Sequence, residues 1–229
     1  MRNPENIFVD FDGVIVDSID ECYKVSSNIF FGLNPTSKKE RIKDLFYEYR
    51  GLVGPVYQYY VLFIALSKFL NDNGICILKN FSNYNLEIND SLKNEFEYLF
   101  FSLRSYYQKN VKAWTCLHRL TTYGKSLQNR DLSSYYIVTT KDKRSVNILL
   151  DYFNIKVDKI YDRDDFKNKG SKGEIISSIM DEKNLKEAIF IDDSQDHLKS
   201  VNDKRVNCFY AKWGYELKKQ DILFPNFKF

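Results

Sequence analysis

Short apolar runs that alternate with helical patterns are the feature that most constrains how this chain folds. The first run consists of β-branched and aromatic residues without polar relief, a composition that suits a strand covered on both faces of a sheet, and the later runs are strand-like as well. The runs occupy residues 7–9, 134–139, 157–161, 188–191 and 206–210. Strands that alternate with helices favour a parallel α/β sheet, whose ligand site lies beyond the carboxyl ends of the strands.

Helical patterns fill the chain between the first run and the second. From residue 17 to about residue 110, one helical pattern follows another with no convincing strand. We expect one of these helices over residues 90–108, and a further helix after the block over residues 111–123. A chain of 229 residues fits a domain with a sizeable insertion. We therefore expect a core domain formed by residues 1–16 and 111–229 and an inserted α-helical domain formed by residues 17–110.

Composition excludes several classes of function. Lysine and arginine outnumber aspartate and glutamate by only three and are dispersed, which is not the basic face of a nucleic-acid-binding protein. The most apolar run, residues 56–70, is interrupted by polar residues and is too short to span a bilayer. We therefore expect neither nucleic acid nor membrane as a partner, and the sequence leaves the oligomeric state open.

The expected compartment follows from the cysteines and the N-terminus. The four cysteines lie far apart and are expected to be small buried side chains in a reducing compartment: Cys22, Cys76, Cys116 and Cys208. The first strand begins within six residues of the N-terminus, which leaves no room for a signal peptide. Together these features predict a cytoplasmic protein.

Two carboxylates follow the first apolar run. Asp10 and Asp12 stand at positions i and i+2 of a strand end, so their side chains point to the same side, and Gly13 allows a sharp turn. Carboxylates this close repel unless a cation or a shared proton compensates them. Mg²⁺ is the natural cation, because it takes oxygen ligands from carboxylates and from substrate phosphate. The alternative is an ordinary polar turn after a strand.

Polar residues also follow two later runs. Thr139 and Thr140 end the second run, and Asp192 and Asp193 follow the run over residues 188–191. Lys172 opens the helical pattern that leads into the latter run. Carboxylates for a divalent cation, donors for an oxyanion and one lysine suit phosphoryl transfer, in which positioning and charge neutralisation supply most of the catalysis.

Each of these residues also has an ordinary structural interpretation. Thr139 alone would be a strand-end hydroxyl, and Asp192 with Asp193 would be a helix N-cap pair. The choice of Lys172 over its near neighbours is open, and further candidates are Lys167 and Lys169 for the lysine and Asp196 for the metal. The two histidines are expected to be surface or packing residues, since no nucleophile–base pairing is evident: His118 and His197.

With these motifs in order, the sequence resembles the haloacid dehalogenase (HAD) superfamily of phosphatases. The matching segments are residues 10–15, residues 137–141, Lys172 within residues 171–174, and residues 189–194. The helical block falls where this family inserts its helical cap, directly after the first motif. The resemblance implies a Rossmann-like parallel sheet core with an inserted α-helical cap domain.

The resemblance also implies roles in catalysis. Asp10 would be the nucleophile that forms an aspartyl-phosphate, and Asp12 would be the general acid and then the general base. Thr139 and Lys172 would hold the phosphoryl oxygens, with Thr140 beside them. The aspartate at position 12 favours phosphoryl transfer over dehalogenation.

The resemblance implies a Mg²⁺ site as well. The Asp10 carboxylate, the backbone carbonyl of Asp12 and Asp193 would hold the ion, and Asp192 would support or also ligate it. Whether Asp192 or Asp196 joins Asp193 stays open.

The expected function is a Mg²⁺-dependent phosphatase acting on a small phosphorylated metabolite of the sugar or hydroxy-acid phosphate type. Two alternatives are a phosphomutase on the same core and a catalytically silent protein that binds a phosphorylated ligand. In the helical block, Arg50 could meet an anionic group of the substrate, although an exposed arginine at a helix end is the alternative.

Overall fold

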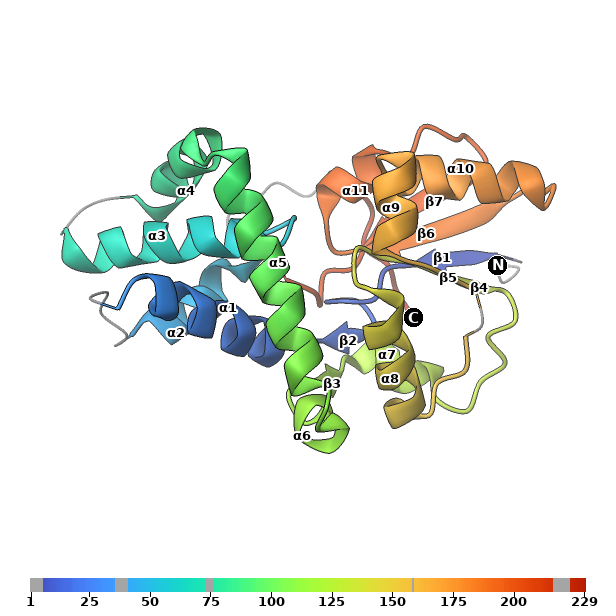
Figure 1. Cartoon of the computed structure of the whole chain (residues 1–229). Coiled ribbons are helices and arrows are strands. Elements are labelled where there is room, and N and C mark those ends of the chain that lie inside the picture. The colour runs from blue at the N-terminus through green and yellow to red at the C-terminus, as the bar shows by residue number, and fades with distance from the viewer. Residues whose placement is uncertain (1–5, 36–40, 73–75, 158, 216–222) are drawn as a thin grey trace. The chain divides into compact units, whose positions relative to one another are not determined.

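The computed structural model describes residues 6–35, 41–72, 76–157, 159–215 and 223–229 (Figure 1). The chain divides into two compact units. The core unit comprises Met1–Ser18 and Arg119–Phe229, and the helical unit comprises Ile19–His118. The chain therefore leaves the core unit after Ser18 and returns to it at Arg119. The helical unit ends later than the boundary expected at residue 110.

A parallel sheet forms the centre of the core unit, which confirms the predicted fold class. In the described part of the chain it has five strands in the order β5-β4-β1-β6-β7. Their bounds are Ile7–Val9 for β1, Tyr135–Val138 for β4, Ile160–Tyr161 for β5, Ala188–Asp192 for β6 and Val206–Tyr210 for β7. The predicted runs therefore all contain strands, although residue 158 of the third run lies outside the described residues.

Helices connect these strands and cover the sheet. They are α7 (Thr122–Leu127), α8 (Lys143–Phe153), α9 (Arg163–Lys169), α10 (Lys172–Glu182) and α11 (Gln195–Lys199). The β4–α8–β5 crossover runs toward one edge of the sheet, whereas the crossover through α10 returns past β1 to β6. Because such crossovers are right-handed, α8 and α10 lie on opposite faces of the sheet (Figure 1).

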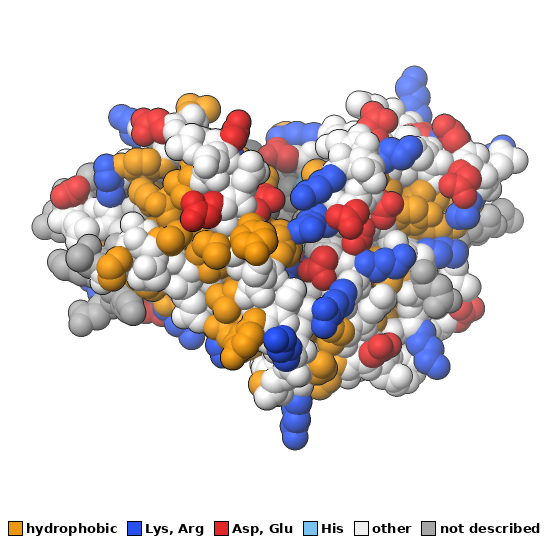
Figure 2. All heavy atoms as spheres, in the orientation of Figure 1, with side chains coloured by type: hydrophobic (Ala, Val, Ile, Leu, Met, Phe, Trp, Pro, Cys, Tyr) orange, Lys and Arg blue, Asp and Glu red, His pale blue; other side chains and the backbone are white. Residues whose placement is uncertain are grey.

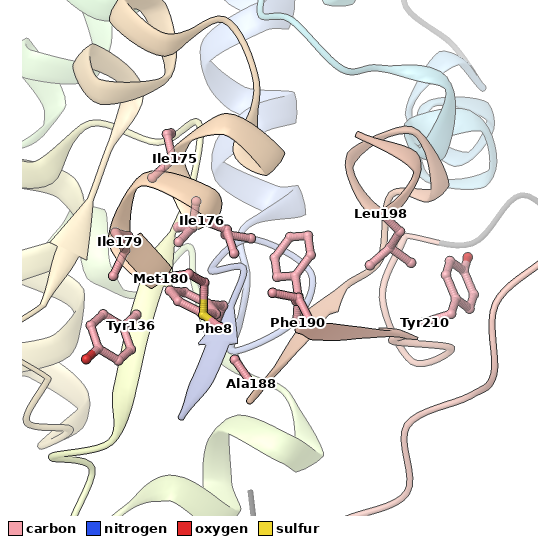
Figure 3. Close-up of a cluster of buried hydrophobic side chains, with 12 residues drawn as sticks. Phe8, Tyr136, Ile175, Ile176, Ile179, Met180, Ala188, Phe190, Leu198 and Tyr210 are labelled. Atoms are coloured by element: carbon pink, nitrogen blue, oxygen red, sulfur yellow. The ribbon is translucent and has the colours of Figure 1, made fainter. Parts of the chain in front are cut away.

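One face of the sheet packs against α10 and α11 through a buried apolar cluster (Figure 3). Ile175, Ile176 and Met180 of α10 lie against Phe8 and its neighbours in register, which are Tyr136 on β4 and Phe190 on β6. Alternate residues of each strand point to this face, and the residues between them point to the other, so an apolar run can cover both faces of the sheet with apolar side chains. This packing fixes the height at which β1 and β6 end, and so the place of the polar residues that follow them.

A two-stranded antiparallel ribbon pairs the segment where the chain leaves the core unit with the segment where it returns. Val16 and Asp17 form β2 (Val16–Asp17), which pairs with β3 (Arg119–Leu120). The prediction of one helix over residues 111–123 is wrong: α6 (Val111–Thr115) ends before β3, and α7 begins after it. The Thr121 hydroxyl explains the new start, because it accepts a hydrogen bond from the backbone N–H of Gly124.

Helices make up the described part of the helical unit. They are α1 (Ile19–Leu33), α2 (Ile42–Tyr49), the short 3₁₀ helix η1 (Arg50–Leu52), α3 (Gln58–Asn71), α4 (Ile77–Glu87), α5 (Asp90–Tyr107) and α6. The helix predicted over residues 90–108 is confirmed as α5. Aromatic rings form much of the core of this unit: Phe63 stacks on Phe30 and Phe46, and Tyr59 stacks on Phe100.

The surface of the described residues carries mixed charge. On the face drawn in Figure 2, lysine and arginine side chains are interspersed with aspartate and glutamate. Among the described residues, every helix is too short or too polar to cross a membrane.

A buried ion pair links two helices inside the helical unit. Both Glu21 carboxylate oxygens accept hydrogen bonds from the Arg104 guanidinium, at 2.8 and 2.9 Å, and the Trp114 indole N–H lies 3.5 Å from the same carboxylate. Glu21 is fully buried and Arg104 nearly so. Removing one partner would leave the other charge buried without compensation.

We therefore expect Arg104→Met to lower the free energy of unfolding by about 3 to 5 kcal/mol. Urea unfolding followed by circular dichroism measures this loss. The matched control is Lys93→Met, which breaks the exposed Lys93–Asp90 pair and should change the free energy by less than about 1 kcal/mol. Equal losses in the two variants would contradict the prediction.

Candidate active site

Lys172 lies between two buried carboxylates at the carboxyl end of the sheet. Its Nζ is 2.7 Å from Asp10 Oδ1 and 2.8 Å from Asp192 Oδ2, and all three side chains are buried. Asp10 directly follows β1, and its backbone N–H donates to the carbonyl of Ile191 on β6 at 2.9 Å. Lys172 is the first residue of α10, which Ser171 caps by accepting from the backbone N–H of Glu174. Three separate segments therefore meet at one ammonium group.

The three groups shift one another's pKa in different directions. Burial raises the pKa of Asp10, Lys172 partly opposes that shift, and the charge on Asp192 reinforces it. Burial also acts to raise the pKa of Asp192, but Lys172 and His197 outweigh it and hold that pKa at about 2. Burial acts to lower the pKa of Lys172, and its two carboxylate neighbours more than offset this and raise it. The lysine therefore stays charged between the acids.

His197 belongs to this cluster, which the sequence did not predict. Its Nδ1 lies 3.2 Å from Asp192 Oδ2, and Asp192 Oδ1 accepts the backbone N–H of Ser194 at 2.7 Å. The expectation that His197 is only a packing residue is therefore too simple, because it contacts a charged member of the site. The feature of the sequence that could have indicated this contact is the position of His197 about one helical turn after Asp192 and Asp193.

Asp12 lies in a second charged cluster. Lys141 Nζ is 3.1 Å from each oxygen of the Asp12 carboxylate, and the Ser18 hydroxyl donates to Asp12 Oδ1 at 2.5 Å. The turn after Asp12 needs glycine, because Gly13 has a φ of +83°, and its N–H donates to the carbonyl of Val16. The sequence did not single out Lys141 or Ser18, although Lys141 follows Thr139 and Thr140 directly.

Thr139 and Thr140 differ in exposure. Thr139 is buried at the end of β4, where its hydroxyl accepts the backbone N–H of Lys141 at 3.2 Å and its own N–H donates to Tyr161. Thr140 is exposed. The two side chains therefore do not share one environment, and Thr139 is the one tied to the Lys141 turn.

Asp193 lies against two glycines. A Cβ atom on Gly13 or on Gly214 would collide with the Asp193 carboxylate. Asp193 Oδ2 also accepts the backbone N–H of Tyr215 at 2.7 Å, and the Tyr215 hydroxyl accepts the backbone N–H of Ser18 at 2.7 Å. Tyr215 thus connects the loop after β6 with the end of β2, a link that no sequence pattern indicated.

The remaining candidates lie outside these clusters. Lys167 and Lys169 are exposed, and Asp196 is exposed and pairs with Lys199 at 3.5 Å. Arg50 belongs to the helical unit, where its guanidinium donates to the carbonyl of Val53 and lies 5.0 Å from the ring centre of Tyr59. A role for Arg50 in substrate binding stays a prediction.

The donor set of the first cluster fits a divalent cation. Ligand atoms of Asp10, Asp192 and His197 lie within 4.8 Å of one another. Buried carboxylate oxygens are the ligands that Mg²⁺ prefers. Burial raises the pKa of Asp10 although Lys172 acts to lower it, so a further cation would favour the ionised carboxylate. Asp193 and the backbone carbonyl of Asp12 are not part of this trio, so their role in holding the metal stays a prediction.

The fold is that of HAD-like hydrolases, as the resemblance predicted. No protein-family model matches the sequence, and a search of curated proteins finds no match. A solved hydrolase of the haloacid dehalogenase-like family from Streptococcus pneumoniae is 18% identical, with a TM-score of 0.56 over 93% of this chain and 87% of its own. A structure described as a predicted phosphoglycolate phosphatase from Haemophilus somnus is 17% identical, with a TM-score of 0.62 over 94% and 88%.

The Lys172 cluster yields a stability prediction. Lys172→Met would leave two buried carboxylates facing each other, and we expect it to lower the free energy of unfolding by about 3 to 5 kcal/mol. Adding Asp10→Asn should recover part of that loss, because it removes one of the two charges. Chemical denaturation of the single and double variants measures both effects.

Lys169→Met is the matched control. Lys169 is an exposed lysine three residues earlier, so its replacement should change the free energy of unfolding by less than about 0.5 kcal/mol. A strictly additive loss in the Lys172→Met/Asp10→Asn double variant would show that the lysine does not compensate Asp10.

Proposed function

We propose that this protein is a Mg²⁺-dependent phosphatase that hydrolyses a small phosphorylated metabolite through an aspartyl-phosphate. The observation that carries the proposal is the Asp10–Lys172 contact of 2.7 Å at the end of β1, within a HAD-like fold. A second carboxylate, Asp12, lies two residues later and contacts a different ammonium group, that of Lys141. This arrangement supplies a nucleophile and a separate acid–base group, which a protein that only binds phosphate does not need.

In the first displacement, an Asp10 carboxylate oxygen attacks phosphorus. The new bond joins Asp10 to phosphorus, and the bond from phosphorus to the alcohol oxygen breaks. Asp12 gives its proton to that oxygen, so the alcohol leaves neutral. Lys172 and the Thr139 hydroxyl bind the phosphoryl oxygens, whose negative charge they offset during transfer.

In the second displacement, water attacks the phosphorus of the aspartyl-phosphate. Asp12, now ionised, accepts a proton from the water, and the bond between Asp10 and phosphorus breaks. Inorganic phosphate leaves, and Asp12 is protonated again for the next cycle. Lys172 holds Asp10 in place as it regains its charge.

Mg²⁺ would be held by the Asp10 carboxylate, the Asp12 backbone carbonyl and Asp193, with Asp192 in support, and would neutralise charge on the phosphoryl group. Asp192 is already engaged by Lys172, His197 and the N–H of Ser194, which suits a supporting role. The exposed side chain of Asp196 argues against a ligand there.

The substrate is proposed to be a sugar or hydroxy-acid phosphate. The structure from Haemophilus somnus described as a predicted phosphoglycolate phosphatase makes that hydroxy-acid phosphate the first compound to try. We propose that the helical unit acts as the cap that selects the substrate and that Arg50 meets its anionic group.

We expect the purified protein to release phosphate from at least one small phosphomonoester in the presence of Mg²⁺. A panel containing phosphoglycolate, sugar phosphates and p-nitrophenyl phosphate, assayed with Mg²⁺ and with EDTA, measures this. EDTA and the Asp10→Asn variant should each abolish the signal, since one removes the metal and the other the nucleophile. Wild-type rates equal to those of Asp10→Asn on the whole panel would refute the proposal.

Asp12→Asn should trap the aspartyl-phosphate. Nitrophenolate leaves without a proton, so the first displacement with p-nitrophenyl phosphate should survive, whereas hydrolysis of the phosphoenzyme should slow by about 10²-fold to 10⁴-fold. Quenched-flow detection of nitrophenol would then show a burst close to one per active site. Rapid multiple turnover without a burst would contradict the base role, and stimulation by a bisphosphate would favour a phosphomutase.

A further inference from the structure

We propose that Lys141 is a positioning residue that orients the Asp12 carboxylate for proton transfer. This inference rests on the proposed phosphatase function and adds a residue to it. The Lys141 side chain is fully buried, and its Nζ lies at the same distance, 3.1 Å, from both oxygens of Asp12. An ammonium group in contact with both oxygens restricts rotation of the carboxylate plane.

Ser18 supplies the second contact that fixes this orientation. Its hydroxyl donates to Asp12 Oδ1 at 2.5 Å and lies 3.4 Å from Lys141 Nζ. Ser18 is itself fully buried, and its backbone N–H donates to the Tyr215 hydroxyl at 2.7 Å. Asp12 is therefore held from two directions, while its side chain keeps 22% exposure through which water or a leaving group can reach it.

The backbone of Lys141 is held at the turn that also carries Thr139. Its N–H donates to the Thr139 hydroxyl at 3.2 Å, and its carbonyl accepts the N–H of Arg163 at 3.2 Å. One residue thus connects the proposed phosphate-binding hydroxyl with the proposed acid–base carboxylate. A small displacement of this lysine would move Asp12 relative to the phosphoryl group, and misplacement by about 1 Å can slow a reaction by about 10²-fold.

A structural ion pair would give the same contacts, so the test must separate orientation from stability. Lys141→Met removes the ammonium and keeps most of the length of the side chain. We expect hydrolysis of the aspartyl-phosphate, which needs Asp12 as base, to slow by roughly 10-fold to 100-fold. The burst of nitrophenol from p-nitrophenyl phosphate should keep its rate, because nitrophenolate leaves without a proton.

The decisive comparison uses the Asp12→Asn background. If Lys141 acts through Asp12, Lys141→Met should slow phosphoenzyme hydrolysis in the wild-type background and have no further effect beside Asp12→Asn. Ser18→Ala should slow the same step by a smaller factor, and it serves if Lys141→Met fails to fold. Lys143→Met, which replaces an exposed lysine on the same turn, should match the wild type.

Three outcomes would overturn the inference. In the first, Lys141→Met and Ser18→Ala both hydrolyse the phosphoenzyme at the wild-type rate. In the second, Lys141→Met slows the reaction as much beside Asp12→Asn as it does alone. Each of these leaves the phosphatase function intact, because the wild type still turns over. A wild type that forms no phosphoenzyme overturns both the inference and the proposed function.

Discussion

The contact of one buried ammonium with two buried carboxylates is the interaction on which the rest of the core unit depends. Lys172 begins α10, Asp10 follows β1 and Asp192 ends β6, so the cluster joins three segments far apart in the sequence. Each charge is acceptable in the interior only while the others are present. The apolar packing of α10 on Phe8 and Phe190 therefore has to bring the helix start to one particular height above the strand ends. Where that packing is correct, the charges compensate one another, and Asp10, the proposed nucleophile, is in place.

Two carboxylates only two residues apart acquire different surroundings from the same fold. Asp10 is buried beside Lys172 and Asp192, whereas Asp12 is partly exposed beside Lys141 and Ser18. A nucleophile has to stay ionised, and an acid–base group has to exchange a proton with a leaving group or water. Lys172, shared with Asp192, contacts Asp10, and a different lysine, Lys141, contacts Asp12, so the two proposed tasks fall in separate surroundings. The turn at Gly13, with its positive φ, lets the chain pass from one environment to the other within three residues.

How much of the fold and of the candidate site can be predicted from the sequence depends on whether a residue's contacts are with residues close to it in the sequence. The apolar runs predicted β1 and β7 at their observed bounds, and strand ends followed by Asp10, Thr139 and Asp192 predicted the edge of the sheet where the site lies. Lys141 and Tyr215 escaped prediction because their partners Asp12 and Ser18 lie 129 and 197 residues away, and a lysine after two threonines is equally typical of a solvated turn. His197 contacts Asp192 only five residues away, so distance does not explain why it escaped prediction. The expected helix over residues 111–123 failed because β3 pairs with β2, a partner outside that window.

The ribbon of β2 and β3 explains how the core unit can carry a large helical insertion without losing its chemistry. The chain leaves after Ser18 and returns at Arg119, and the pairs Val16–Leu120 and Asp17–Arg119 hold the two crossings side by side. Ser18, the last residue before the helical unit, is fixed from within the core unit by Tyr215 and in turn contacts Asp12. The described contacts of Asp12, the proposed acid–base carboxylate, therefore come from residues of the core unit. If the helical unit selects the substrate, as we propose, changes in its helices would alter which substrate binds, while the described contacts of Asp10 and Asp12 would remain defined by the sheet and its loops.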